Sequence, residues 1–451
     1  MFGIKVRLLV LGLIVSLTMA LACSDDTRRG SGGSGGGDDC GEGLKFNPIL
    51  GECEVDQGGG GGADNGTPDN NVDNNTNGSD AGVDADDNGS NNPNGPDTNN
   101  PPPVVDPGEC GPGNLIGRAC APSGAVLAAA EVIVEGIDCD GAPFTRTTTT
   151  NGEGEFQLDG VPSGEQELTI RSGSFESDRV VVIRNGQTTD LTGEAEKVCL
   201  EGGSAKIAVI KGAYDHIQGV LDDLGLEYDI RGGDGGGGAI ASPQSDINNS
   251  VSFLQSAQAM SEYDIVFINC GTLWQRSIPE ASRDLIIESL RTFVQSGKSL
   301  YVSDHAHPFV QRAFPEMLDF YGNDAEHVEA RQGYAPQSIT ARVGSVGMQT
   351  LLGRETAEIQ FPHDPSNDIY NNNWVVAQGA NANTTVHLDG TAVLCGNSTC
   401  TSQGSSVSEA PLLVSFDASP GRVIFTSFHN KAQADYNDDM IAIMRYLIFQ
   451  L

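Results

Sequence analysis

The chain has 451 residues and a formal net charge of −36, from 61 acidic and 25 basic side chains. This length leaves room for two or three domains. The acidic balance argues against a nucleic-acid-binding protein, because such proteins need basic side chains to displace the counterions of the phosphate backbone. The charge fits a solvated, extracytoplasmic protein.

The N-terminus predicts a signal peptide over residues 1–22. Lys5 and Arg7 precede an apolar run, residues 8–21, that is too short for a stable membrane span. The run ends in Ala20-Leu21-Ala22-Cys23, and polar residues follow. This resembles the lipobox of bacterial lipoproteins, in which the cysteine is lipidated. The resemblance implies a cell-envelope protein, anchored in a membrane through Cys23, at the periplasmic or the cell-surface face. An ordinary signal peptide cleaved nearby is the alternative.

Residues 23–109 predict a disordered tether that follows the lipidated cysteine. Gly, Asn and Asp dominate this region, and such a composition cannot bury enough apolar surface to fold. Within it, residues 40–53 predict a small disulfide-closed knot. Residues Asp84 to Gly89 match the first half of a calcium loop, but the twelfth position is Gly95, where a bidentate Glu is expected. A chance half-match is the preferred interpretation.

Nine cysteines remain after Cys23. The simplest connectivity joins neighbours in the sequence, which sequence alone does not fix. It predicts the disulfides Cys40–Cys53, Cys110–Cys120, Cys139–Cys199 and Cys395–Cys400, with Cys270 left over. No C-x-x-C pair occurs, which disfavours a zinc ribbon or a thioredoxin-type site. Disulfides support export.

Residues 111–200 predict a small all-β sandwich. Strand-like runs lie at 131–134, 146–150, 155–158, 167–170 and 179–183, with turn residues between them. Residues 149–164 contain Thr-Asn-Gly-Glu-Gly-Glu-Phe followed by Gly-Val-Pro-Ser-Gly. This resembles the carboxypeptidase regulatory-like family, and the resemblance implies a transthyretin-like fold. It also implies a spacer or accessory module without catalytic residues, from a group sometimes placed with carbohydrate-binding-like sandwiches. The aromatic residues here are few: Phe144, Phe156 and Phe175.

Residues 204–451 predict an α/β domain with a doubly wound, mostly parallel sheet. Buried strands are expected at 205–210, 226–230, 264–269, 300–303 and 422–427. Amphipathic helices are expected from Ile217 to Leu224, with Gly225 as C-cap, from Asp284 to Ser296, and around Met440 to Ile448. Alternation of β and α units favours parallel pairing. The segment 337–415 is more β-rich and predicts a hairpin closed by Cys395–Cys400.

Polar residues follow four of these strands, where open parallel sheets gather their functional groups. The resulting binding-cleft candidates are Asp215, His216, Asn269, Cys270, Ser303, Asp304, His305, His307, His429 and Asn430. Cys270 is interpreted as an inert core thiol, and His216 as a surface residue of the first helix. Asp304 either lines the cleft or caps the helix after it.

The strand order, the turn Gly-Lys-Ser-Leu-Tyr-Val-Ser-Asp at 297–304 and the late Thr-Ser-Phe-His at 426–429 resemble the flavodoxin-like, class I glutamine amidotransferase-like superfold. Working members of that family carry a nucleophilic Cys on this turn and a His-x-Glu on a late strand. Here the turn has Ser303, Asp304 and His305, and Lys431 stands where the Glu is expected. Only His429 matches, so the family chemistry is not expected.

The sequence therefore favours a lipoprotein whose α/β domain binds an extracytoplasmic ligand or protein without catalysis. No cofactor is expected. The first alternative is a hydrolase that uses Asp304, His305 and His429. A divalent metal is one option, with Asp304, His305 and His307 as ligands together with His429 or His216, since imidazole and carboxylate suit zinc or iron. The second is an accessory protein that binds a glycan through the sandwich.

Overall fold

The computed structural model describes residues 44–47, 52–55, 110–234, 242–320, 330–362, 373–428 and 437–451. It divides into two units, 1–95 and 96–451. In the first unit, β1 (Leu44–Asn47) pairs antiparallel with β2 (Glu52–Val55), with Phe46 opposite Cys53. This hairpin overlaps the predicted knot at residues 40–53 and extends two residues beyond it. Cys23, Cys40, the signal peptide, most of the tether and the calcium half-match lie outside the described residues, so those predictions stay predictions.

The all-β part of the second unit consists of two four-stranded sheets. One has the order β10-β3-β6 with β9 beside β3, and the other has the order β5-β4-β7-β8. Their bounds are β3 (Pro112–Cys120), β4 (Glu131–Ile137), β5 (Pro143–Thr149), β6 (Glu155–Pro162), β7 (Gly164–Ser172), β8 (Phe175–Ile183), β9 (Thr188–Leu191) and β10 (Val198–Cys199). Alternate residues such as Val132 and Val134 are fully buried between the sheets, as expected for a sandwich. The predicted β-sandwich is confirmed.

Two predicted disulfides are wrong. The structure joins Cys110 to Cys139 and Cys120 to Cys199. Cys110 lies two residues before the extended strand β3 and Cys120 is its last residue, and an extended segment of this length separates its ends by about 30 Å, far beyond the reach of a disulfide. Cys199 instead lies directly opposite Cys120 on the adjacent strand β10. The third described bridge, Cys395–Cys400, is confirmed.

The rest of the second unit is built on an eleven-stranded mixed sheet with the order β12-β11-β13-β14-β23-β22-β21-β16-β19, to which β17 and β18 attach at β21. The strands in chain order are β11 (Ile207–Lys211), β12 (Tyr228–Gly233), β13 (Ile265–Ile268), β14 (Ser299–Ser303), β16 (Gln332–Tyr334), β17 (Gln337–Val343), β18 (Thr356–Phe361), β19 (Asn373–Val375), β21 (Thr384–Cys395), β22 (Gln403–Ala418) and β23 (Gly421–Thr426). A separate pair joins β15 (Leu318–Phe320) and β20 (Ala377–Ala380).

Only the first five strands in that order are parallel to one another. Numbered along the chain they run 2-1-3-4-5, an order found in doubly wound sheets. All strands from β22 onward pair antiparallel. The expectation of a mostly parallel sheet is therefore corrected, because long hairpins such as β21–β22 extend it antiparallel. The amidotransferase-like assignment itself stays a prediction.

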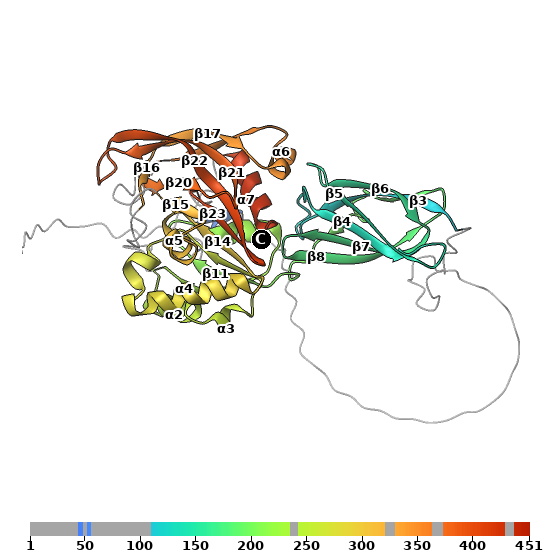
Figure 1. Ribbon diagram of the computed structural model, residues 1–451, viewed down its shortest axis with the longest axis horizontal. Coiled ribbons are helices and arrows are strands. Elements are labelled where there is room, and N and C mark those ends of the chain that lie inside the picture. The colour runs from blue at the N-terminus through green and yellow to red at the C-terminus, as the bar shows by residue number, and fades with distance from the viewer. Residues whose placement is uncertain are drawn as a thin grey trace, which may run out of the picture. The chain divides into compact units, whose positions relative to one another are not determined.

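Helices cover both faces of the parallel strands. Their bounds are α1 (Ile217–Leu224), α2 (Gln244–Leu254), α3 (Ala257–Met260), η2 (Leu273–Ser277), α4 (Glu280–Gln295), η3 (Asp304–Ala306), α5 (Pro308–Ala313), α6 (Val346–Leu352) and α7 (Asp438–Ile448). Buried residues of α1 and α7 share one apolar cluster, and those of α2, α4 and α5 share another. Figure 1 shows α2, α3 and α4 grouped together on one side of these strands. No helix in the described part of the chain is long and apolar enough to cross a membrane.

The sandwich and the α/β part pack together within the second unit. The ring of Phe175 meets that of Phe449 edge-on at 5.1 Å, and Ser172 Oγ donates to the Phe449 carbonyl over 2.8 Å. A Cβ added at Gly173, whose φ is +57°, would come within 2.1 Å of the Leu451 carbonyl oxygen. Both parts also contribute to one apolar cluster. The interface between the sandwich and the α/β part therefore buries apolar surface and provides hydrogen-bond donors to the backbone carbonyls that follow α7.

Candidate functional site at the carboxyl ends of the parallel strands

The carboxyl ends of the parallel strands bring together most of the predicted site residues that are described. Asp215 follows β11, Asn269 and Cys270 follow β13, and Ser303 ends β14. Each is at most 3% exposed. The 2-1-3-4-5 order reverses direction beside β11, and such a switch point is where open α/β sheets bind ligands. His429 and Asn430, which follow β23, lie outside the described residues.

Ser303 is the centre of a buried hydrogen-bond network. Its hydroxyl donates to Asp215 Oδ2 over 2.6 Å and accepts the Cys270 backbone N–H over 2.8 Å. The residue is fully buried. Among the described residues no imidazole contacts this hydroxyl. An activated serine needs a base that takes its proton and a face open to substrate. Ser303 instead ties the turn after β11 to the turn after β13.

Asp304 is the backbone outlier of the site. Its φ is +44°, although it carries a side chain. Oδ1 accepts the Val375 backbone N–H over 2.7 Å, and Oδ2 lies 3.4 Å from the Cys270 thiol that donates to it. No side-chain cap of the helices that follow involves this carboxylate. The helix-cap interpretation is therefore wrong, because the left-handed backbone turns the carboxylate toward β19 and Cys270.

Cys270 is a buried free thiol, as predicted. Burial raises the pKa of this thiol well above its usual value, and the charges of Asp304 and Asp215 raise it further. A thiol becomes nucleophilic as the thiolate, which such surroundings disfavour. Cys270 therefore acts as a small apolar side chain with one weak donor.

Half-buried polar side chains border this network. His305 Nε2 lies 3.0 Å from Asn373 Oδ1, and Asn373 Nδ2 donates to Gln332 Oε1 over 3.0 Å. Gln275 Nε2 donates to the His305 carbonyl over 3.0 Å. The ring of Tyr214 stands 6.5 Å from that of His305. We name Tyr214, Gln275, His305, Gln332 and Asn373 the polar rim.

The other predicted histidines that the structure describes, His307 and His216, do not belong to the polar rim. His307 is 2% exposed and its ring packs 5.0 Å from the Phe320 ring. Both of its ring nitrogens lack a hydrogen-bond partner among the described residues. Burial, with the nearby His305, lowers the pKa of its imidazole to about 3, so it is neutral. His216 is exposed at the start of α1, as predicted.

The candidate metal ligands do not converge. Asp304 turns to Val375 and Cys270, His305 turns to Asn373, and His307 enters the core. Within the described ranges no group of three His, Cys, Asp or Glu side chains could hold a metal ion. Whether His429 changes this lies outside the described residues.

Three residues of this region were missed: Asp234, and Asn373 and Gln332, which no sequence signal selects. Asp234 is 2% exposed after β12, and its Oδ2 accepts the Thr272 N–H over 2.7 Å. A Cβ at Gly271 would lie 2.1 Å from that oxygen, so the close approach requires glycine. Asn269 donates to Gln218 over 3.0 Å, and its Oδ1 is unpartnered among the described residues. The polar residue after each buried strand was the available signal for Asp234.

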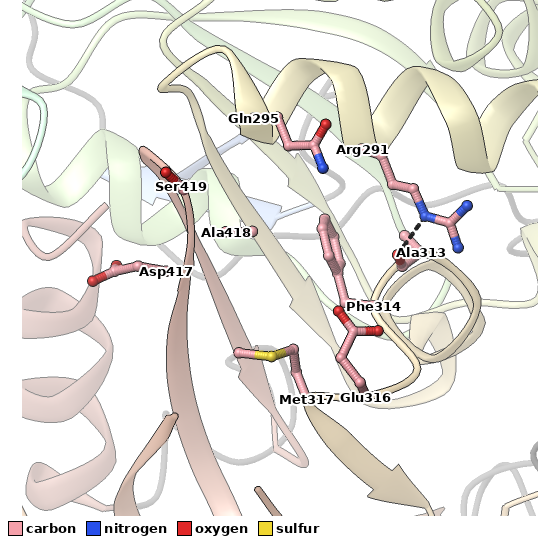
Figure 2. Close-up of a pocket in the computed structure, with 9 residues that line it drawn as sticks. All are labelled: Arg291, Gln295, Ala313, Phe314, Glu316, Met317, Asp417, Ala418 and Ser419. Carbon is pink, nitrogen blue, oxygen red and sulfur yellow. Dashed lines mark hydrogen bonds between the residues drawn. The ribbon is translucent and has the colours of Figure 1, made fainter. Parts of the chain in front are cut away.

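A pocket lies at the opposite edge, near the amino ends of β14 and β23 (Figure 2). None of the predicted site residues lines it.

These features define the class of the molecule: a disulfide-bonded β-sandwich packed on a mixed α/β unit with polar strand ends. Residues 114–194 match the carboxypeptidase regulatory-like domain family. That resemblance of the sandwich is thus confirmed. A search of curated proteins finds no match to the chain.

Several solved structures are partly similar. A cytoplasmic protein from Salmonella typhimurium LT2 has a TM-score of 0.33 and 14% identity, covering 54% of this chain and 98% of that one. A Pseudomonas aeruginosa protein, provisionally named as carbohydrate binding, has a TM-score of 0.15 and 18% identity, covering 18% of this chain and 89% of that one. A beta-galactosidase from Bacillus circulans has a TM-score of 0.26 and 12% identity, covering 54% of this chain and 30% of the enzyme. TM-scores this low carry no functional argument, so the argument below rests on the geometry of this chain.

Proposed function

We propose that this chain is a lipid-anchored, extracytoplasmic binding protein. Its α/β part offers a site for a small polar ligand at the strand ends, and the sandwich serves as an accessory module. The observation that carries the proposal is that both candidate nucleophiles are buried and engaged: Ser303 with Asp215, and Cys270 with Asp304. The disulfides of the sandwich suit an oxidising compartment.

Two backbone features support a ligand site here rather than a purely structural edge. Asp304 holds a left-handed conformation, which costs a residue with a side chain about 1 kcal/mol or more and tends to persist at functional sites. The segment after β13, Leu273–Ser277, is a π-helix, a rare form that is frequent at such sites. Gln275 of this π-helix reaches His305, so both features border the polar rim.

The alternatives have less support. A hydrolase would need Asp304 and His305 to act on one substrate, and their side chains have separate partners in Val375 and Asn373. Glycan binding by the sandwich would need exposed aromatic rings. Phe156 and Phe175 are 5% and 0% exposed and belong to the core, and Phe144 is half-buried against it, so at most one ring is open to a sugar.

The test uses the soluble form of the chain that starts at residue 24. We expect no turnover of p-nitrophenyl esters, anilides or glutamine above that of an Asp304→Asn variant. Thermal shifts against neutral sugars, amino acids and small organic acids should reveal a stabilising ligand, since a ligand that binds only the folded state stabilises it. Asn373→Ala should remove the shift, and Asn249→Ala, on the exposed face of α2, should retain it. Turnover abolished by Asp304→Asn or His305→Ala would refute the proposal.

Anchoring is tested separately in cells. Labelled palmitate should enter the full-length protein, and Cys23→Ala should abolish both labelling and recovery in the membrane fraction. Membrane recovery of the unlabelled Cys23→Ala protein would contradict lipid anchoring.

A further inference from the structure

The pocket of Figure 2 lies away from the polar rim and has a volume of about 470 Å³. Three segments enclose it: the end of α4, the turn after α5, and the turn between β22 and β23. Its lining residues are Arg291, Gln295, Ala313, Phe314, Glu316, Met317, Asp417, Ala418 and Ser419. This volume is within the range of small-molecule sites, about 300–1,000 Å³.

Its floor is apolar and held in place. Phe314 and Met317 are 3% and 8% exposed. The Phe314 ring meets the Phe416 ring edge-on at 5.5 Å, and the Met317 carbonyl accepts the Thr384 hydroxyl over 2.8 Å. An apolar ligand group would therefore meet a surface that needs no rearrangement.

Two of the three charged side chains that line the pocket are already engaged. Arg291 donates from Nε to the Ala313 carbonyl over 2.7 Å and from Nη2 to the Arg312 carbonyl over 2.9 Å. It thus neutralises the carboxyl end of α5. Asp417 is paired with Arg422 at 2.8 Å.

Glu316 is the third charged side chain that lines the pocket. It is exposed, and the bond it makes among the described residues is at its backbone carbonyl, which accepts from Asn381; its carboxylate has no hydrogen bond or ion pair with any residue that the structure describes. In Figure 2 its side chain lies beside those of Phe314 and Met317. A carboxylate next to a fixed apolar floor matches a ligand with an apolar stem and a cationic end.

We propose that this pocket binds an alkylammonium group, with the alkyl stem on Phe314 and Met317 and the cation beside Glu316. The net charge of −36 adds a long-range attraction for cations. The group can come from a free alkylamine or from a lysine side chain of a partner polypeptide, which share this chemistry. The proposal does not depend on a ligand at the polar rim.

Titration calorimetry of the soluble chain with n-alkylamines of four to eight carbons tests it, with the matching n-alkanols as neutral controls. The amines should bind more tightly as the alkyl chain lengthens, by at most about fourfold with each added methylene, since a fully buried CH₂ contributes about 0.8 kcal/mol. Glu316→Gln should weaken amine binding about fivefold and leave alkanol binding unchanged. Glu262→Gln, an exposed glutamate before β13, should change neither.

N-acetyl-lysine methylamide separates the two sources. Tighter binding than that of butylamine indicates a polypeptide partner, and weaker binding indicates a free amine. Alkanols that bind as tightly as the amines, amine binding that survives Glu316→Gln intact, or the absence of amine binding would each overturn the proposal.

Discussion

Replacing Ser303 by Ala tests whether the buried network is structural. The change removes a hydroxyl that donates to Asp215 over 2.6 Å and accepts from the Cys270 N–H over 2.8 Å. A hydrogen bond to a charged group contributes about 1.5–3 kcal/mol, and a buried N–H left without a partner costs about 1–3 kcal/mol. The sum predicts a loss of about 2.5–6 kcal/mol, a large part of the 5–15 kcal/mol that stabilises a typical protein.

The assay is urea unfolding of the soluble chain with its disulfides intact. The two tryptophans, Trp274 and Trp374, both lie buried in the α/β part, so fluorescence reports the unfolding of that part. Ser405→Ala, an exposed serine on β22, is the matched control and should change stability by less than about 0.5 kcal/mol. A loss below about 1 kcal/mol in Ser303→Ala, similar to the control, would refute the structural role.

Three further predictions follow from buried or crowded groups. Burial lowers the folded-state pKa of His307 to about 3, from an ordinary value of 6.5, so below about pH 6.5 the unfolded chain gains a proton that the folded chain excludes. Stability should fall by up to about 1.4 kcal/mol per pH unit between pH 6 and 4, and His307→Phe should reduce that slope in acid titrations of unfolding. Removing the Cys120–Cys199 bridge by double Ser substitution should lower the free energy of unfolding by about 4.5 kcal/mol, and removing Cys395–Cys400 by about 2 kcal/mol, because the first bridge closes the longer loop. Urea unfolding midpoints measure both losses, and equal losses would contradict the loop argument. Gly173→Ala should disrupt the contact between the β-sandwich and Leu451 of the α/β part, because the added Cβ would collide with the Leu451 carbonyl. Limited proteolysis between the sandwich and the α/β part should then be faster, and an unchanged cleavage rate would count against that contact.

The repeating units of the fold were predictable because their signals are local. The helix from Ile217 to Leu224 buries its apolar residues at helical spacing and ends at Gly225, whose φ of +70° only glycine adopts without strain. The helix α2 was missed, since Gln244–Leu254 is rich in Ser and Asn and shows little apolar periodicity. Strand β3 was missed as well, because Pro112 and two glycines weaken its strand signal, and this misled the pairing of Cys110 and Cys120.

The site was predictable in location but not in contacts. A polar residue after a buried strand identified Asp215, Asn269 and Ser303, since parallel strands carry their carboxyl ends to one edge. Sequence could not show that Asn373 meets His305, because the two are 68 residues apart and belong to separate elements. Nor could it show the left-handed backbone of Asp304, which decides where that carboxylate points.

The proposal that the α/β part is not a nucleophilic enzyme is tested most directly by reactive labelling. The folded soluble chain would be exposed to a fluorophosphonate and to iodoacetamide, and modified residues would be mapped by mass spectrometry. We predict no label at Ser303 or Cys270 until the chain is unfolded, because both are fully buried and hydrogen-bonded. Stoichiometric labelling of either residue in the folded protein would contradict the account.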